Sequence, residues 1–203
     1  MFQSLISFDV NMLNLIMGTV NQNNYFMISL IKIFSDFGVI FVALSLVGLW
    51  LFGVYRKDNK YKNISLMIFY TIAFSFILYI IINKGFPLRP RPETVSSIRP
   101  LIDHLPDNSF PSGHAIFAGA ALVGFFFFWP NLIYSSILII ASFLMFYSRI
   151  ASGVHYPGDI LVGFILGILF GYIFYTIQKN LKSQKLINNI NKKIIKLFSF
   201  IKL

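Results

Sequence analysis

The run "AIFAGAALVGFFFFWPNLIYSSILIIASFLMFYS", residues 115–148, contains no aspartate, glutamate, lysine or arginine. A helix that crosses a membrane needs about 20 consecutive apolar residues, so this run is too long for a single span. Near its middle, residues 129–131 read "WPN", and both proline and asparagine favour a tight turn. We therefore predict two membrane spans joined in a hairpin.

The composition of the whole chain is typical of a membrane protein. Hydrophobic residues make up 57% of the 203 residues, only 12% are charged, and the mean hydropathy is +0.74. In soluble domains about 25% of residues are charged. The length accommodates one bundle of about five or six spans and no second domain. Because the chain has no cysteine, disulfide bonds and thiolate metal sites are excluded.

Three further stretches without Asp, Glu, Lys or Arg are long enough to span the membrane: 37–55, 63–83 and 160–178. The first of them is expected to begin near Tyr25, so that it carries Lys32 and Asp36, four residues apart on one helix face. This spacing predicts an ion pair that makes both charges tolerable in the membrane. We predict an all-α, polytopic membrane helix bundle of about five spans, forming a single domain over residues 1–203.

Both ends of the chain are predicted to form amphipathic helices at the membrane surface. In residues 4–18, polar positions recur at helical spacing opposite apolar side chains, which predicts an interfacial helix. This segment lacks the basic region that begins a signal peptide. Residues 179–203 carry seven lysines with apolar residues along one side. They predict a basic amphipathic tail on an anionic leaflet, with a disordered, solvated tail as the alternative.

Basic residues predict which side of the membrane each loop occupies. The loop 55–62 contains four lysines and arginines and the tail contains seven, of the 17 in the chain. If five spans alternate, both segments lie on one side, which the positive-inside rule assigns to the cytoplasm. We expect a multi-pass protein of the cytoplasmic membrane, with residues 84–112 on the outer face. Because topology explains most of the net charge of +10, no nucleic-acid partner is implied.

Three polar clusters interrupt the apolar sequence on the predicted outer side: "KGFPLRPRP" at 84–92, "PSGH" at 111–114 and "SRIASGVHYPGD" at 148–159. Alternation of the spans allows all three to converge on one site. Their lysine and arginine side chains, together with the free N–H groups of a helix start, suit an anion with two or more negative charges. We expect Pro111 in the first turn of that helix, with Ser109 or Ser112 as its cap.

Two histidines accompany this predicted anion site. Asp159 follows His155 by four residues, near the start of the last span, so its carboxylate is placed to orient the imidazole. His114 lies on another helix and is free to donate a proton to a leaving oxygen. Phosphoryl transfer through histidine fits both positions. A metal site fits less well, because the acidic residues of this side form no clustered pair at ligand spacing.

The order and spacing of these residues resemble the type 2 phosphatidic acid phosphatase (PAP2) superfamily of membrane lipid phosphatases. The signature of that family is K-x6-RP, PSGH and SR-x5-H-x3-D. This chain has the required residue at every position: Lys84, Arg91, Pro92, Pro111, Ser112, Gly113, His114, Ser148, Arg149, His155 and Asp159. The hydrophobic layout beyond these segments is also similar to that of the family.

The resemblance implies a lipid phosphatase that works without a metal or other cofactor. It implies His155 as the nucleophile, Asp159 as its partner and His114 as the acid that protonates the leaving group. The phosphate contacts that it implies are Lys84, Arg91, Ser112, Gly113 and Arg149. Arg89 lies outside the signature and is interpreted as an auxiliary phosphate or headgroup contact.

The substrate is the least determined part of the sequence analysis. The short first helix is similar to that of small undecaprenyl-diphosphate phosphatases of the bacitracin-resistance type. Arg89 beside Arg91 offers a further cation that suits a second phosphate, so we favour undecaprenyl diphosphate over phosphatidate, phosphatidylglycerophosphate or lipid A. A transporter or channel is disfavoured because the charges cluster at one face. His104 is interpreted as a solvated loop residue, and the oligomeric state stays open.

Overall fold

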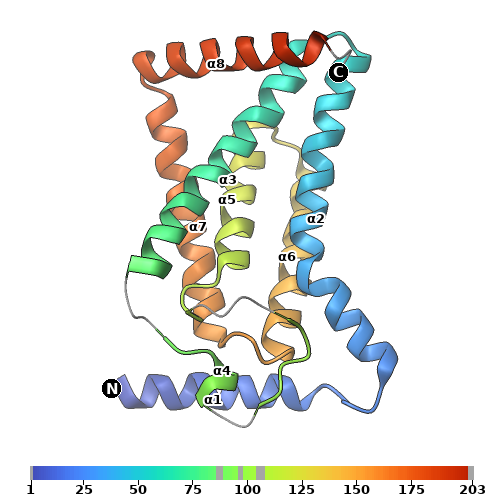
Figure 1. The fold of residues 1–203 in the computed structure, drawn as a ribbon, viewed down its shortest axis with the longest axis vertical. Helices are drawn as coiled ribbons and strands as arrows, with labels where there is room; N and C mark the ends of the chain where they lie inside the picture. Colours follow the sequence, from blue (N-terminus) through green and yellow to red (C-terminus); the bar gives the residue numbers. More distant parts are fainter. Residues whose placement is uncertain (1, 86–88, 96–97, 104–107, 201–203) are drawn as a thin grey trace.

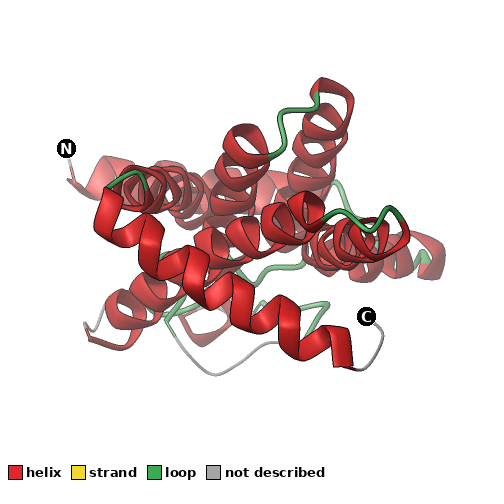
Figure 2. Ribbon diagram, turned by 90° about the horizontal axis from the view of Figure 1, so that it is seen from above, coloured by secondary structure: helices red, strands yellow, loops and turns green. Residues whose placement is uncertain are grey.

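The computed structural model describes residues 2–85, 89–95, 98–103 and 108–200, and the chain is all-helical within these ranges (Figures 1 and 2). The helices are α1 (Phe2–Gly18), α2 (Tyr25–Tyr55), α3 (Asn59–Gly85), α4 (Pro92–Val95), α5 (Gly113–Phe128), α6 (Leu132–Ala151), α7 (Pro157–Gln178) and α8 (Leu181–Phe200). The predicted all-α fold class is therefore confirmed.

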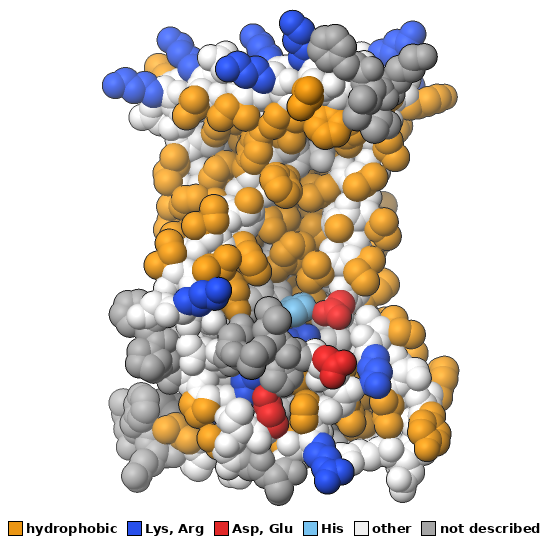
Figure 3. Space-filling model, viewed as in Figure 1, with side chains coloured by type: hydrophobic (Ala, Val, Ile, Leu, Met, Phe, Trp, Pro, Cys, Tyr) orange, Lys and Arg blue, Asp and Glu red, His pale blue; other side chains and the backbone are white. Residues whose placement is uncertain are grey.

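The helices form a bundle that is closed at each end by a helix lying across it (Figure 1). Four helices, α2, α3, α6 and α7, are long and apolar enough to cross a membrane. The shorter apolar helix α5, with 16 residues, runs beside them. A band of hydrophobic side chains separates two ends that carry the charged side chains (Figure 3). The protein is therefore a multi-pass membrane protein, in which α5 accounts for the fifth expected span.

The predicted hairpin is confirmed at residues 129–131. Helix α5 ends at Phe128 and α6 begins at Leu132, with Asn131 as its N-cap. The Asn131 side chain accepts a hydrogen bond of 2.9 Å from the backbone N–H of Tyr134. This bond satisfies one of the free N–H groups at the helix start. The Pro-Asn pair thus ends one helix and begins the next.

Helix α5 lies against α7 with almost no side chain between the two backbones. A Cβ atom on Gly167 would lie 2.2 Å from the carbonyl oxygen of Ile116, and one on Gly119 would lie 2.4 Å from that of Phe164. Small residues of this kind allow membrane helices to approach closely. At the ends of the two helices, the backbone N–H of Ser112 donates to the carbonyl of Asp159 at 3.1 Å. The contact therefore joins the starts of α5 and α7.

Helix α1 lies across the end of the bundle at which α5 and α7 begin (Figure 1). Its buried Leu13 belongs to an apolar cluster with Ile150, Tyr156 and Ile160, while Asn11 stays exposed. The predicted helix is confirmed. Its place at a membrane surface stays a prediction.

Helix α8 crosses the opposite end of the bundle (Figures 1 and 2). Its Asn191 is buried, accepts a hydrogen bond from the Tyr70 hydroxyl at 2.9 Å and donates to Asn63 Oδ1 at 3.0 Å. The lysines of α8 are exposed at this end (Figure 3). The tail is thus a docked helix, so the disordered alternative is wrong. Its contact with an anionic leaflet stays a prediction.

Candidate active site

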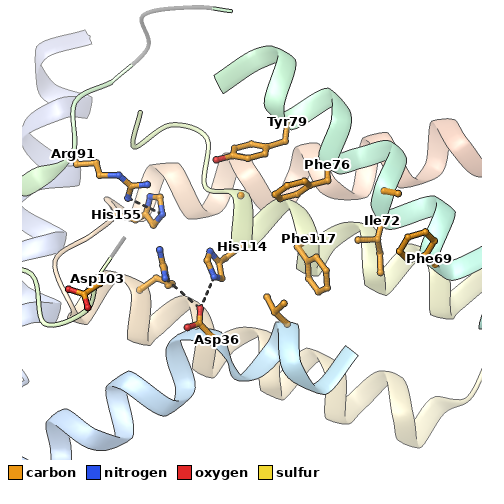
Figure 4. Close-up of a pocket in the computed structure, with 14 residues that line it drawn as sticks. Asp36, Phe69, Ile72, Phe76, Tyr79, Arg91, Asp103, His114, Phe117 and His155 are labelled. Carbon is orange, nitrogen blue, oxygen red and sulfur yellow. Dashed lines mark hydrogen bonds and ion pairs between the residues drawn. The ribbon is translucent and has the colours of Figure 1, made fainter. Parts of the chain in front are cut away.

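A pocket of about 550 Å³ opens between α2, α3 and α5, toward the end of the bundle covered by α1 (Figure 4). Its polar part is lined by Asp36, Arg91, Asp103, Gly113, His114, Arg149 and His155. Its apolar part is lined by Val39, Phe69, Ile72, Ala73, Phe76, Tyr79 and Phe117. One cavity therefore joins a cationic, histidine-bearing region to an aromatic region within the membrane-spanning helices.

The pocket lies where α2 and α3 separate. Near α8 the two helices are held together, because Ser65 Oγ donates to the carbonyl of Leu46 at 2.9 Å and the rings of Phe52 and Tyr61 meet edge to face. Toward α1 they diverge (Figure 1). The aromatic side of the pocket is open to the surroundings of the bundle, since Phe69 is 53% exposed.

His155 lies in the turn between α6 and α7 and is only 2% exposed. Gly153 shapes this turn with a φ of +79°, which glycine adopts without a Cβ penalty. The Nδ1 atom of His155 lies 3.0 Å from the carbonyl oxygen of Ser109 and 3.7 Å from Asp159 Oδ2. Because both neighbours are acceptors, we assign the proton to Nδ1.

The other ring nitrogen of His155 faces a cation. Its Nε2 atom lies 3.4 Å from a terminal nitrogen of Arg91, and both residues line the pocket (Figure 4). Burial, together with the charges of Arg149 and Arg91, lowers the pKa of His155 to about 4, against the raising effect of Asp159. The imidazole is therefore neutral at pH 7, and the lone pair of Nε2 faces Arg91.

Asp159 lies 3.7 Å from His155 and is also connected to it through Ser109. Its buried carboxylate accepts the Ser109 hydroxyl through Oδ2, which also accepts the backbone N–H of Tyr156 at 2.9 Å. Ser109 in turn offers its carbonyl to the imidazole. The expected His155–Asp159 pair is thus present, but Ser109 mediates its short contacts.

The start of α5 differs from the expected capping pattern. Gly113 is the first helical residue and Ser112 is the N-cap, but its side chain forms no capping hydrogen bond. Pro111 precedes the cap rather than lying in the first turn, and Ser109 is engaged by Asp159 instead of capping. Within the described part of the chain, the buried hydroxyl of Ser112 has no hydrogen-bond partner. Ser112 is fully buried and is not among the residues that line the pocket, so its contact with phosphate stays a prediction.

The expected ion pair between Lys32 and Asp36 is wrong. Asp36 Oδ1 lies 2.8 Å from Nε2 of His114 and 3.8 Å from a terminal nitrogen of Arg149 (Figure 4). The reason is that Asp36 faces the start of α5, which carries His114, and the end of α6, which carries Arg149. Lys32 is exposed. Asp36 is therefore a pocket residue that was interpreted as structural.

Three of the predicted phosphate contacts lie outside the pocket lining: Ser112, Lys84 and Arg89. Lys84 is exposed at the end of α3. Arg89 donates to Asp9 at 2.5 Å and to Asp159 at 3.2 Å, and its guanidinium lies 3.4 Å from the ring centroid of Tyr156. All three contacts with phosphate stay predictions, and the geometry gives Arg89 other partners. His104 lies outside the described residues.

Sequence analysis missed three neighbours of the candidate site residues: Asp9, Asp36 and the carbonyl of Ser109. Each of them meets its partners only through the fold, since 78 residues separate Asp36 from His114. Within the described ranges, no group of three or more His, Asp or Glu side chains could hold a metal ion. The expectation of a metal-independent reaction stays a prediction.

Comparison with known proteins gives consistent results. The family model of the PAP2 superfamily matches residues 63–183. Undecaprenyl-diphosphatase BcrC of Bacillus subtilis is 30% identical over 86% of this chain and 91% of its own length. Lipid A 1-phosphatase of Rhizobium johnstonii is 29% identical over 52% of this chain and 44% of its own.

A solved structure has the same arrangement of helices. The crystal structure of Aquifex aeolicus LpxE matches with a TM-score of 0.64 and 28% identity, over 82% of this chain and 94% of that one. The family match, the full-length relative and the shared fold agree with the signature residues gathered around the pocket. The chain belongs to the PAP2 superfamily of phosphatases.

Proposed function

We propose that this membrane phosphatase hydrolyses undecaprenyl diphosphate to undecaprenyl phosphate through a phosphohistidine at His155. The observation that carries the proposal is the pocket itself, in which cations and two histidines lie beside an aromatic region between α2 and α3. A lipid with a phosphorylated headgroup matches both regions. The similarity to BcrC, which extends over 86% of the chain, favours the diphosphate over the other lipid phosphates.

The proposed reaction has two steps. In the first, Nε2 of His155 forms a bond to the terminal phosphorus while the bond from that phosphorus to the bridging oxygen breaks, and His114 protonates the departing oxygen. In the second, water attacks the phosphohistidine, gives a proton to His114 and releases inorganic phosphate. Arg91 and Arg149 stabilise the charge on the phosphoryl oxygens throughout.

The neighbours of the two histidines fit these roles. The carbonyl of Ser109 fixes the proton of His155 on Nδ1, which leaves Nε2 directed at the phosphate site. Asp36 accepts a hydrogen bond from His114, which orients the imidazole that is proposed to protonate the leaving oxygen. The hydroxyl of Ser112 has no hydrogen-bond partner among the described residues and lies next to the pocket residue Gly113, so we propose it as a further donor for a phosphoryl oxygen.

Monophosphate lipids remain the alternative substrates. The relatives named lipid A 1-phosphatase match about half of the chain, and the contacts of Arg89 with Asp9 and Asp159 remove the original reason for expecting a second phosphate site. The preference for the diphosphate therefore rests on the full-length similarity. By the positive-inside rule we place the reaction at the outer face of the cytoplasmic membrane.

The test is a side-by-side turnover assay of the purified protein in detergent with a chelator present. The substrates are undecaprenyl diphosphate, phosphatidate, phosphatidylglycerophosphate and lipid A, and released phosphate is measured. We expect the highest kcat/KM for undecaprenyl diphosphate and no release by His155→Ala. A higher kcat/KM for any of the monophosphate lipids would reject the diphosphate, and loss of activity with the chelator would reject the metal-independent mechanism.

A further inference from the structure

Asp9 connects helix α1 to the residues around His155. Its Oδ2 accepts a hydrogen bond of 2.5 Å from Arg89, and the same nitrogen of Arg89 donates to Asp159 Oδ1 at 3.2 Å. Its Oδ1 accepts the backbone N–H of Gly158 at 2.8 Å. One carboxylate from α1 therefore holds both the cation beside Asp159 and the first turn of α7.

The surroundings of Asp9 are shaped to receive this carboxylate. A Cβ on Gly158 would lie 2.9 Å from Asp9 Oδ2, so glycine at this position leaves the space that the carboxylate fills. The Asp9 side chain is only 14% exposed. The N–H of Gly158 lies in the first turn of α7, where N–H groups lack a partner within the helix, and the helix dipole favours a negative charge there.

We infer that Asp9 is a positioning residue that acts through Arg89 on Asp159, so that the docking of α1 completes the active site. The inference rests on the proposed role of His155. Asp159 is fully buried, and a buried carboxylate needs a cation and hydrogen bonds to stay charged and fixed. Arg89 supplies that cation. In this arrangement Arg89 serves Asp159 and does not bind the substrate.

Asp9 sets the position of Arg89 because one guanidinium nitrogen is shared between two carboxylates. Stacking on the Tyr156 ring fixes the plane of the guanidinium, and Asp9 fixes its direction. Without Asp9, Arg89 loses the shorter of its two carboxylate contacts. The guanidinium that donates to Asp159 Oδ1 is then less firmly held. The displacement reaches His155 through Ser109, which bonds to both.

The test is a double-mutant cycle on kcat and KM with Asp9→Asn, Arg89→Gln and the double variant. It uses the lipid phosphate that the wild-type protein hydrolyses fastest, so failure of the diphosphate proposal leaves this test intact. We expect Asp9→Asn to lower kcat about tenfold or more, as loss of supporting residues commonly does, with KM nearly unchanged. The double variant should be no slower than Arg89→Gln alone. Asn11→Ala, an exposed change on α1, should have the wild-type kcat.

Two results would overturn the inference. One is a wild-type kcat for Asp9→Asn. The other is a rise in KM for Arg89→Gln, together with a loss of kcat/KM in the double variant that equals the product of the two single losses. That result is expected if Arg89 binds phosphate independently of Asp9.

A second variant covers the case in which Asp9→Asn does not fold. Gly158→Ala moves the carboxylate of Asp9 without altering its charge, and Gly18→Ala, with no atom within 4 Å of the new Cβ, is its control. We expect a lower kcat for Gly158→Ala alone, and an unchanged kcat would contradict the inference.

Discussion

His155 shows how the surroundings of a single residue prepare it for chemistry. One ring nitrogen faces acceptors, the carbonyl of Ser109 and the carboxylate of Asp159, and the other faces Arg91 at 3.4 Å. Its burial keeps the ring neutral, and the acceptors determine which nitrogen carries the proton. This arrangement fits the proposed role of nucleophile, because the unprotonated nitrogen faces the cationic side of the pocket.

The protonation of His155 gives the first prediction. Since burial lowers its pKa to about 4, we expect NMR of the three histidines in detergent micelles to show one ring that stays neutral until the pH falls near 4. His155→Ala assigns that signal by its loss. The unfolded chain binds this proton near pH 6.5, so stability should fall as the pH drops from 6.5 toward 4. A midpoint at or above 6.5 would contradict the assignment.

Asp36 gives the second prediction at this scale. If the contact with Asp36 orients His114 for leaving-group protonation, Asp36→Asn should slow hydrolysis of phosphatidate, whose leaving alkoxide needs a proton, by part of the ~10²–10⁴-fold that general acids contribute. An activated aryl phosphate should lose much less. Lys32→Gln, an exposed change on the same helix, is the control and should match the wild type. Equal losses on both substrates would count against the acid role.

At the scale of helices, the glycine contact between α5 and α7 brings His114 and Asp159 into one site. The two helices start side by side because Gly119 and Gly167 let their backbones meet. The contact therefore determines how the PSGH segment faces the turn that carries His155.

Gly167→Ala tests this contact. The added Cβ would lie 2.2 Å from a backbone oxygen, and overpacking of this kind costs about 1–3 kcal/mol. For a chain of this size, each kcal/mol shifts Tm by about 2–4 °C. Gly48→Ala, with no atom within 4 Å of its new Cβ, should not lower Tm. Equal melting temperatures for both variants in detergent would show that the close approach is not needed.

The helices could be predicted from the sequence because their signals are local. Charge-free runs set the spans, and the Pro-Asn pair at residues 130–131 set the hairpin. The docking of α8 by its buried Asn191 could not be predicted, since the partners Asn63 and Tyr70 lie more than 100 residues away.

The site was predictable where its residues form a compact signature. Arg91, Gly113, His114, Arg149 and His155 were predicted and line one pocket. The carboxylate of Asp36, which contacts His114 and Arg149, was not predicted. When only sequence spacing is considered, Asp36 pairs equally well with a lysine one helical turn away. Its partner is decided by which helix packs against that face.

At the scale of the whole molecule, the two ends of the bundle differ in the polar residues that they carry. The exposed lysines of α8 lie at one end, and the pocket lies toward the other, where α1 crosses (Figures 1 and 3). From the positive-inside rule we expect the α8 end to be cytoplasmic and the α1 end external.

Labelling of single cysteines tests this orientation. The natural chain has no cysteine, so Val95→Cys in α4 and Asn59→Cys at the start of α3, both exposed positions, each provide one thiol. A membrane-impermeant thiol reagent on intact cells should label Val95→Cys and should label Asn59→Cys only after the cells are opened. The reverse pattern would overturn the orientation.

The central claim is that His155 carries the phosphoryl group during turnover. The most direct measurement is mass spectrometry of the protein quenched during turnover of undecaprenyl diphosphate, under conditions that preserve phosphohistidine. We predict one added phosphoryl group on the peptide that contains His155. The group should be absent from the His155→Ala variant, which should fold but release no phosphate. A phosphoryl group on another residue, or phosphate release by His155→Ala, would contradict the claim.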